Sequence, residues 1–214
     1  MQITGIEGYK EKVYAVTLDV EKKIYIHHEV ILEHDLKIGS EIDLEELKKI
    51  MKESDLKCAW ERALTILDQR DHSYTEMYNK LERTFSSDVC YETLQKLVEL
   101  GKIDDRRYAK ELARIYIEVK HYGVYKATYE MQSRGLDKEL IEQSLALYEK
   151  LSPARLEMLI ERKYGPNLTN ENGEIDDMGV IKVRSALMRQ GFPFEQVNNA
   201  IDKYLIDTIG VGIN

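Results

Sequence analysis

The sequence has little cysteine and little proline. Its 214 residues include two cysteines, Cys58 and Cys90, and three prolines. The two cysteines lie far apart and have no further cysteine or histidine at metal-ligand spacing, so we expect neither a disulfide nor a structural metal site. We therefore expect a reduced chain in which both thiols are small buried side chains.

The sequence also lacks a long apolar run. No stretch approaches the roughly 20 apolar residues of a membrane-spanning helix. The first residues, 1–16, lack the basic segment followed by an apolar segment that marks a secretory signal. Charged residues make up 33% and hydrophobic residues 43% of the chain, which argues against both a membrane protein and general disorder. We expect a cytoplasmic protein, without membrane association, that folds as one or two domains.

An excess of positive charge is missing as well. The formal net charge is −8, whereas a protein that binds DNA without sequence preference is normally basic. The cations are unevenly distributed, however, because every arginine lies after residue 60. The side chains that bind phosphates or carboxylates in a bidentate manner are thus confined to the later part of the chain, where they can form a local basic face.

The motifs of common enzyme classes are absent. There is no phosphate-binding glycine loop, no dinucleotide-binding pattern and no nucleophile elbow. Asp104 and Asp105 stand together like a catalytic pair, but N-capping and the helix dipole favour acidic residues at a helix start. We expect a protein without catalysis, cofactor or metal.

The N-terminal part of the sequence predicts a small α/β segment over residues 1–53. Residues 19–22 suit a hairpin turn. A short helix is expected over 28–36, and a capping box at 43–46 begins another that runs to about Lys52. β-Branched and aromatic residues predict three strands, over residues 2–5, 13–18 and 23–27.

From residue 54 onward the sequence repeats itself in helical segments. An offset of 50 aligns Leu81 with Met131, and an offset of 56 aligns Met131 with Leu187. A three-helix unit of this size buries only part of its apolar surface, so neighbouring units must stack. We predict a mainly α protein in which three tandem repeats form an elongated curved array. The expected divisions are repeats over 54–103, 104–151 and 152–207, a loop inserted in the third at about 165–178, and a tail over 208–214.

Capping residues and glycines predict the limits of the helices. In the first repeat, helices should begin at Ser54, at a capping box from Ser73 to Glu76, and at Ser87, and the last should end at Gly101. In the other two repeats, helix breaks or ends are expected at Gly123, Gly135 and Gly191. Helix starts are expected at Asp137, Pro153 and Pro193.

The end of the first repeat resembles a known family. Arg70, Ser73 and Glu76 give an R-x-x-S-x-x-E pattern. It is followed by a junction with a fixed order of residue types, namely Gly101, Ile103, Asp104, Asp105, Tyr108 and Ala109. Together with the repeats and the small β segment, this pattern resembles the RecX family. We give its motif residues a structural role, together with the repeat-ending Gly135, Gly191 and Phe192.

The resemblance implies a function and a partner. RecX proteins bind in the groove of the RecA filament on single-stranded DNA, contact adjacent protomers, and limit filament growth, ATP hydrolysis and strand exchange in recombination and the SOS response. The implied partner is the RecA filament, with weak, salt-dependent binding of single-stranded DNA, and the protein is expected to be a monomer. Two alternatives stay open: a helical module that binds single-stranded nucleic acid directly, and a scaffold for another protein.

A filament-binding protein should present cations to acidic and phosphate groups, with aromatic residues adding contact area. Tyr122 and Tyr125 can stack on a partner or a base. Lys182 and Arg189 share a helix face, but Arg184 lies about 160° from Lys182. The candidate contacts are the basic residues of the repeats: Arg70, Arg83, Arg106, Arg107, Arg114, Lys120, Lys126, Arg134, Arg162, Lys163, Lys182, Arg184 and Arg189.

Overall fold

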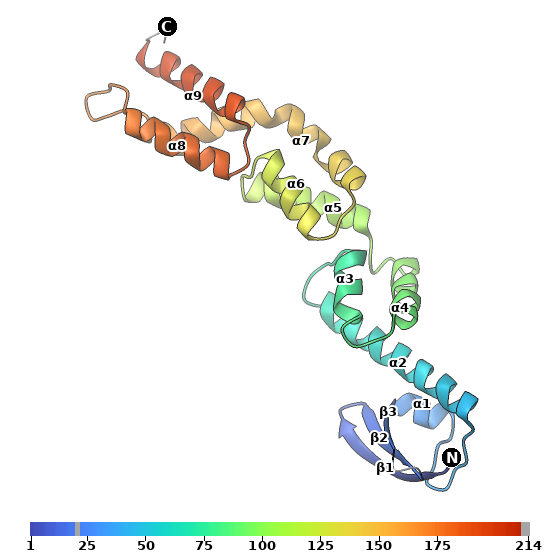
Figure 1. Ribbon diagram of the computed structural model, residues 1–214. Helices are drawn as coiled ribbons and strands as arrows, with labels where there is room; N and C mark the ends of the chain where they lie inside the picture. Colours follow the sequence, from blue (N-terminus) through green and yellow to red (C-terminus); the bar gives the residue numbers. More distant parts are fainter. Residues whose placement is uncertain (20–21, 211–214) are drawn as a thin grey trace. The chain divides into compact units, whose positions relative to one another are not determined.

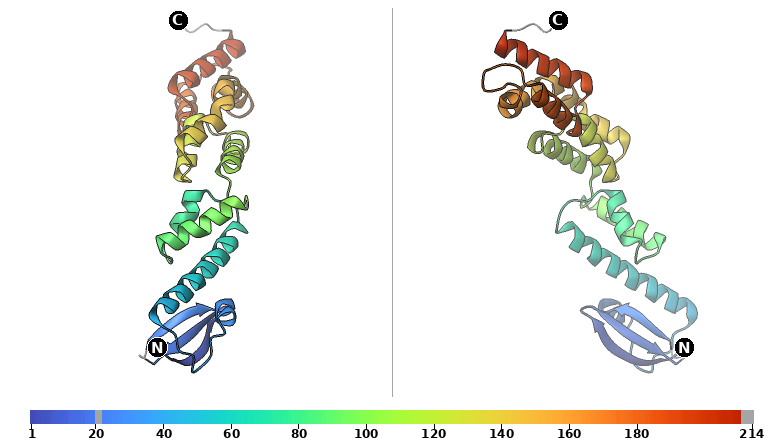
Figure 2. Two further views of the ribbon diagram at one scale, coloured as in Figure 1. Left: turned by 90° about the vertical axis from the view of Figure 1, so that its right-hand side faces the viewer. Right: turned by 60° about the vertical axis from the view of Figure 1, so that its left-hand side comes forward.

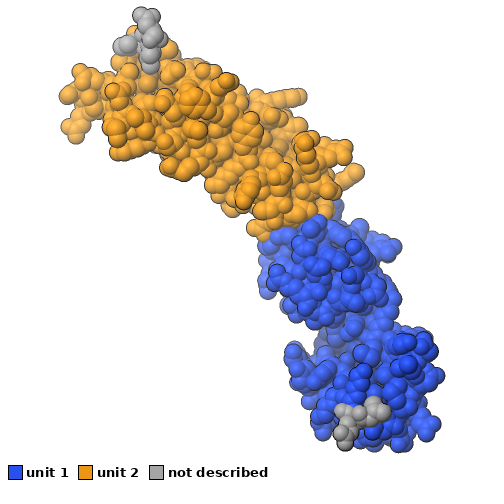
Figure 3. All heavy atoms as spheres, in the orientation of Figure 1, with its two compact units in different colours: residues 1–104 blue, residues 105–214 orange. Residues whose placement is uncertain are grey.

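The computed structural model describes residues 1–19 and 22–210 (Figure 1). Most of the expected tail over 208–214, and the middle of the expected turn at 19–22, lie outside these residues. The chain forms two compact units, residues 1–104 and 105–214 (Figure 3). The predicted fold class is confirmed, since helices dominate and a small antiparallel sheet lies near the N-terminus. No helix in the described residues is long and apolar enough to cross a membrane.

The sheet contains β1 (Ile3–Lys10), β2 (Val13–Leu18) and β3 (Lys23–His27), paired antiparallel in that order. The last two strands have the predicted limits, whereas the first is longer than predicted and its pairing with β2 is irregular at two points. Val16 pairs with Ile24, and both side chains are buried. The sheet therefore has one face packed into the core of unit 1.

Helix α1 (His28–Glu33) follows the sheet, and α2 (Leu44–Leu67) begins at Asp43, whose side chain accepts hydrogen bonds from two main-chain amides. The predicted break and new helix start at Ser54 are wrong, since α2 is one continuous helix (Figure 2). The Ser54 hydroxyl is buried and accepts a hydrogen bond of 2.8 Å from the main-chain amide of His27. Ser54 thus fixes α2 to the sheet instead of capping a helix.

Helices α3 (Tyr74–Leu81) and α4 (Ser87–Glu99) complete unit 1. The capping box between Ser73 and Glu76 is confirmed. Gly101 follows the end of α4 with a φ of +65°, as expected for the C′ position. Cys90 is buried as predicted, but Cys58 is only half-buried.

Unit 2 consists of helices, two of which continue into π-helical turns. In chain order its elements are α5 (Asp105–Arg114), the π-turn η1 (Ile115–Val119), α6 (Val124–Ser133), α7 (Lys138–Leu159), the π-turn η2 (Ile160–Tyr164), the short 3₁₀ segment η3 (Gly165–Asn167), α8 (Asp177–Arg189) and α9 (Phe194–Ile209).

The predicted helix start at Pro153 is wrong, because α7 continues through this proline. A proline removes one main-chain hydrogen bond from a helix interior. Next to it, the buried Ser152 hydroxyl forms a hydrogen bond of 3.0 Å with Gln196 of α9. Two of the proposed repeat boundaries therefore fall within continuous helices, α2 and α7, and the division into repeats stays a proposal.

Positions that align in the sequence repeat are buried to the same extent. Leu81, Met131 and Leu187 are each fully buried, in α3, α6 and α8. Gly135 and Gly191 follow α6 and α8 with φ values of +71° and +89°. The repeat thus preserves both core positions and helix ends.

The segment predicted as an inserted loop consists of η3, turns and an isolated bridge, and part of it is buried. Leu168 is fully buried, and Thr169 and Ile175 form an isolated antiparallel bridge. The Asn170 side chain accepts hydrogen bonds from the amides of Asn172 and Glu174. The insertion therefore packs back onto the start of α8.

Candidate functional site

Each of the two π-turns lies close to a Tyr-Gly pair: η1 ends three residues before Tyr122-Gly123, and η2 ends at Tyr164, the first residue of Tyr164-Gly165. Such widened turns are rare in helices and are frequent at functional sites. Both contribute side chains to one groove in unit 2.

At the end of η1, the main-chain carbonyl of Ile117 lacks the amide donor that a continuing helix would supply. The amide of Lys120 bonds to Ile115, and the amide of Tyr122 bonds to Tyr116. Between them, His121 has a φ of +56°, which turns the chain out of the helix. The guanidinium of Arg155, from α7, donates a hydrogen bond to the carbonyl of Ile117. A cation from α7 therefore takes the place of the missing helical amide.

Arg155 belongs to a small polar network. The Tyr148 hydroxyl donates a hydrogen bond of 2.6 Å to a Glu118 carboxylate oxygen. Burial raises the pKa of Tyr148, and the bond to Glu118 adds to this shift. Burial lowers the pKa of Arg155, but a guanidinium stays charged in proteins. The half-buried cation of Arg155 thus lies in the electrostatic field of this pair and lines the groove.

The groove has a volume of about 420 Å³. Four of its residues are basic or can become cationic, one is acidic, and three are apolar. They are His121, Arg155, Arg162, Lys163, Glu118, Met158, Leu159 and Phe192. This combination suits a ligand that is both acidic and partly apolar.

Close backbone contact fixes one wall of the groove. The amide of Gly123 donates a hydrogen bond of 2.7 Å to the carbonyl of Gln190. A Cβ atom at Gly123 would lie 2.2 Å from the Gly191 carbonyl oxygen, and one at Gly191 would lie 2.4 Å from the amide nitrogen of Lys126. These glycines allow α6 to approach the end of α8, which positions the buried Phe192 beside the groove.

A cluster of aromatic and basic side chains lies on α6 and just before it. The Tyr122 ring stacks on Tyr116, with centroids 5.9 Å apart and planes 12° apart. The amines of Lys120 and Lys126 lie 5.8 Å and 4.2 Å from the Tyr122 ring centre. Tyr125 and Tyr129 are 67% and 70% exposed and stand one helical turn apart. The predicted cations Lys120 and Lys126 thus lie against the half-buried Tyr122 ring, next to a helix face that carries two exposed tyrosines.

Helix α8 carries the three basic residues that the sequence singled out. Lys182 and Arg189 are exposed, whereas Arg184 is half-buried. The Nε atom of Arg184 is buried and has no hydrogen-bond partner among the described residues. The three side chains do not form one exposed basic face, in agreement with their spacing.

The other predicted contacts are dispersed. Arg70 binds the Glu76 carboxylate at 2.9 Å and thus supports the capping box, and Arg114 binds Glu111 at 2.7 Å, within its own helix. Arg162 and Lys163 line the groove of unit 2. Of the remainder, three are exposed and one is half-buried, namely Arg83, Arg106, Arg107 and Arg134.

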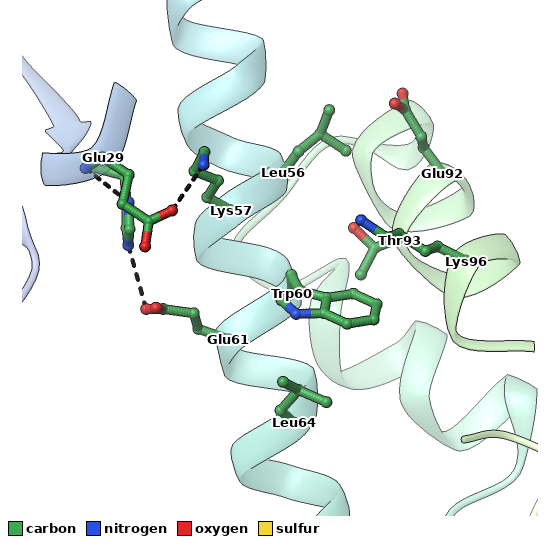
Figure 4. Close-up of a pocket in the computed structure, with 10 residues that line it drawn as sticks. Glu29, Leu56, Lys57, Trp60, Glu61, Leu64, Glu92, Thr93 and Lys96 are labelled. Carbon is green, nitrogen blue, oxygen red and sulfur yellow. Dashed lines mark hydrogen bonds and ion pairs between the residues drawn. The ribbon is translucent and has the colours of Figure 1, made fainter. Parts of the chain in front are cut away.

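Unit 1 contains a second groove, of about 500 Å³, between β3, α1, α2 and α4 (Figure 4). Trp60, Leu56 and Leu64 of α2 form its apolar part, and Lys96 of α4 lies 4.9 Å from the Trp60 ring centre. The buried Thr93 hydroxyl, also in α4, has no hydrogen-bond partner among the described residues.

The carboxylates around this second groove are paired with lysines. Glu29 binds Lys57 at 2.7 Å, and Glu92 binds Lys52 at 3.0 Å. Glu61 binds Lys12 at 2.5 Å, and its other oxygen lies 3.4 Å from Nε2 of the buried His27. Burial opposes ionisation of Glu61, but the hydrogen bond from Lys12 and the proximity of His27 outweigh it and lower its pKa. These pairs join α2 to the sheet through Glu61, to α1 through Glu29 and to α4 through Glu92.

Sequence reasoning missed several of these residues, among them Arg155, Met158, Trp60 and Glu61. Each of these side chains contacts residues that are distant in the sequence, so no local spacing identifies it as a site residue. The alignment of Tyr122-Gly123 with Tyr164-Gly165 was the available signal for the π-turns. In residues 1–19 and 22–210, no three His, Cys, Asp or Glu side chains are grouped so that they could hold a metal ion.

The fold and the groove define a mainly helical protein with a small N-terminal sheet and a cation-lined groove in unit 2. Residues 104–145 match the family description "RecX, second three-helix domain". The chain belongs to the RecX family.

Relatives match over about half to nearly all of the chain. The Regulatory protein RecX of Clostridium tetani is 28% identical over 211 residues, covering 95% of this chain and 94% of its own. That of Chlorobium phaeobacteroides is 36% identical over 100 residues, covering 46% of this chain and 66% of its own. A solved structure, "Crystal structure of regulatory protein RecX", shares the fold with a TM-score of 0.62 at 20% identity, covering 94% of this chain and 98% of that one.

Proposed function

We propose that this protein regulates the RecA recombinase by binding the RecA filament on single-stranded DNA, and that binding limits ATP hydrolysis, filament growth and strand exchange. It acts in the cytoplasm, as a monomer and without catalysis of its own, in recombination and the SOS response. The observation that carries the proposal is the match to proteins named Regulatory protein RecX over 95% of the chain.

The geometry supports binding to an acidic protein surface. The groove of unit 2 combines Arg155, Arg162 and Lys163 with apolar side chains, as a protein interface does. The net charge of −8 disfavours naked DNA as the main partner, because long-range repulsion opposes its approach. A filament that carries its DNA inside a protein surface fits both features.

The test is the ATPase activity of RecA on single-stranded DNA, with this protein added at amounts below that of RecA. We expect the rate to fall, because a filament that cannot extend loses active protomers. A rate that stays unchanged at tenfold excess over filament ends would contradict the proposal.

A second candidate function, direct binding of single-stranded nucleic acid, is favoured by α6. Tyr125 and Tyr129 are exposed, and Lys120 and Lys126 lie beside Tyr122, which is the combination that binds bases and phosphates. Titration of a fluorescent oligonucleotide at several salt concentrations tests this function. Binding through phosphates requires that log K falls as log salt rises, and that Tyr125→Ala with Tyr129→Ala weakens the complex.

A further inference from the structure

Helix α7 has an apolar stripe on its exposed side. Leu147, Leu151 and Met158 are 65%, 47% and 49% exposed. With the exposed Ala154 they follow the spacing i, i+4, i+7 and i+11, which places them within about 60° on the helix. The opposite side of α7 is also apolar, because Leu145 and Leu156 are buried in the two cores of unit 2. The helix therefore has more apolar surface than its own unit covers.

The stripe has the dimensions of a helix-docking surface. From Leu147 to Met158 it extends about 16 Å, which equals three helical turns. Apolar residues spaced by three and four positions are the pattern by which one helix binds along another. Aromatic rings, on which a base could stack, are absent from the four stripe residues, and leucine and methionine offer nothing to a phosphate. The surface thus fits a protein segment better than a nucleic acid.

The charges beside the stripe are positive. Lys150 and Arg155 lie on opposite sides of it, about 60° and 80° from Leu147. At its end, Met158 enters the groove that also contains Arg162 and Lys163. The nearby carboxylate of Glu157 is bound to Lys203 at 2.7 Å, and Glu161 lies with it on the side facing α9. Glu118, the acidic residue of the groove, accepts a hydrogen bond from Tyr148 and is outnumbered by Arg155, Arg162 and Lys163. The net charge along the stripe and in the groove is therefore positive and attracts acidic groups.

We propose that this face of α7 docks an acidic amphipathic helix of a protein partner. Its apolar side chains cover Leu147, Leu151 and Met158, and its acidic side chains enter the groove at Arg155, Arg162 and Lys163. This inference rests on the proposed function and adds to it the kind of surface that the filament presents.

Photo-crosslinking tests the inference directly. The full-length protein carries p-benzoylphenylalanine in place of Leu151, or, as control, in place of Glu149, which lies about 160° away on the helix. RecA filaments on single-stranded DNA are added, and binding of the unmodified protein is measured first. Absence of that binding would count against the proposed function, whereas the inference is judged only on a protein that binds.

We expect the residue at position 151 to crosslink to RecA, within a helical peptide that combines apolar residues at three- and four-residue spacing with Asp or Glu. The residue at position 149 should crosslink much less. Crosslinks to DNA, to a basic peptide, or with equal yield from both positions would overturn the inference.

Substitutions give a second readout. Leu151→Asp with Met158→Asp should weaken filament binding at least tenfold, because it places negative charge opposite an acidic helix. The matched control, Met178→Asp with Ile206→Asp, changes two other exposed apolar residues of unit 2 and should leave binding within twofold. Melting curves that match the unmodified protein show that both variants fold. Equal binding of the two double variants would contradict docking at α7.

Discussion

The guanidinium of Arg155 donates a hydrogen bond to the main-chain carbonyl of Ile117, 38 residues earlier in the chain. This bond joins the long helix α7 to the π-turn η1, at the point where His121 turns the chain out of the helix. One side chain thus contributes to the stability of unit 2 and also places a positive charge at the base of the groove.

Replacing Arg155 with alanine should destabilise the protein. The Ile117 carbonyl would lose its donor, and a hydrogen bond to a charged group contributes about 1.5–3 kcal/mol. We expect the free energy of unfolding, measured by urea denaturation, to fall by about that amount. Arg162→Ala is the matched control, because this exposed side chain should change stability by no more than about 0.5 kcal/mol. Equal effects of the two substitutions would show that the bond to Ile117 contributes nothing specific.

Gly123→Ala should destabilise unit 2 through a steric clash. The added Cβ would lie 2.2 Å from the Gly191 carbonyl oxygen, so α6 and the end of α8 would have to separate. We expect a loss of about 2–3 kcal/mol on unfolding, in the range of overpacked core positions. Gly8→Ala is the control, because a Cβ there meets nothing within 4 Å. A similar loss in both variants would indicate a general cost of replacing glycine and not a close contact.

Local signals in the sequence predicted much of the fold. Strands β2 and β3, the Ser73–Glu76 capping box and the stop at Gly101 depend on neighbouring residues, and each is confirmed. The starts predicted at Ser54 and Pro153 were wrong for a tertiary reason. Ser54 can cap a helix, but its hydroxyl bonds instead to the amide of His27 in the sheet.

Pro153 and Arg155 show where local reasoning ends. A proline suits both a first helical turn and, at some cost, a helix interior, and nothing in its neighbours separates the two. Arg155 was not a candidate because its partner, Ile117, comes from another helix. The groove of unit 2 depends on such pairings, so the sequence predicted Arg162 and Lys163 but not the side chains that complete the site.

The stability of the protein should decrease as the pH falls through the range of histidine ionisation, in part because of His72. Burial lowers the pKa of this side chain, and Nδ1 forms a hydrogen bond of 2.9 Å with the carbonyl of Arg70. The unfolded chain takes up a proton near pH 6.5, whereas the folded chain does so only at lower pH. The stabilisation is therefore complete above about pH 6.5 and is lost as the pH falls toward the folded-state pKa, by up to about 1.4 kcal/mol per pH unit.

His72→Asn tests this dependence. Asparagine can donate to the Arg70 carbonyl but does not titrate. We expect the difference in unfolding free energy between pH 7.5 and pH 5.5 to be smaller in the variant than in the unmodified protein. The other four histidines are present in both, so their contribution cancels. An identical difference in the two proteins would rule out His72 as a source of the pH dependence.

Charge reversal on α8 should weaken binding to the RecA filament without unfolding the protein. Lys182 and Arg189 are exposed, so Lys182→Glu with Arg189→Glu changes the charge of a surface and not of the core. A glutamate near the C-terminal end of α8 opposes the helix dipole, which costs about 0.3–1 kcal/mol and leaves the melting temperature nearly unchanged. If this face meets acidic groups of the filament, the dissociation constant should rise at least tenfold.

The control for α8 is Lys23→Glu with Lys48→Glu, which makes the same change in net charge at two exposed lysines of unit 1. Long-range repulsion alone would weaken both double variants equally, and the difference would vanish at high salt because exposed charges are screened. A specific contact at α8 predicts a larger loss for the Lys182 and Arg189 variant at every salt concentration. Equal losses would remove α8 from the filament interface and leave the groove of unit 2 as the basic surface to test.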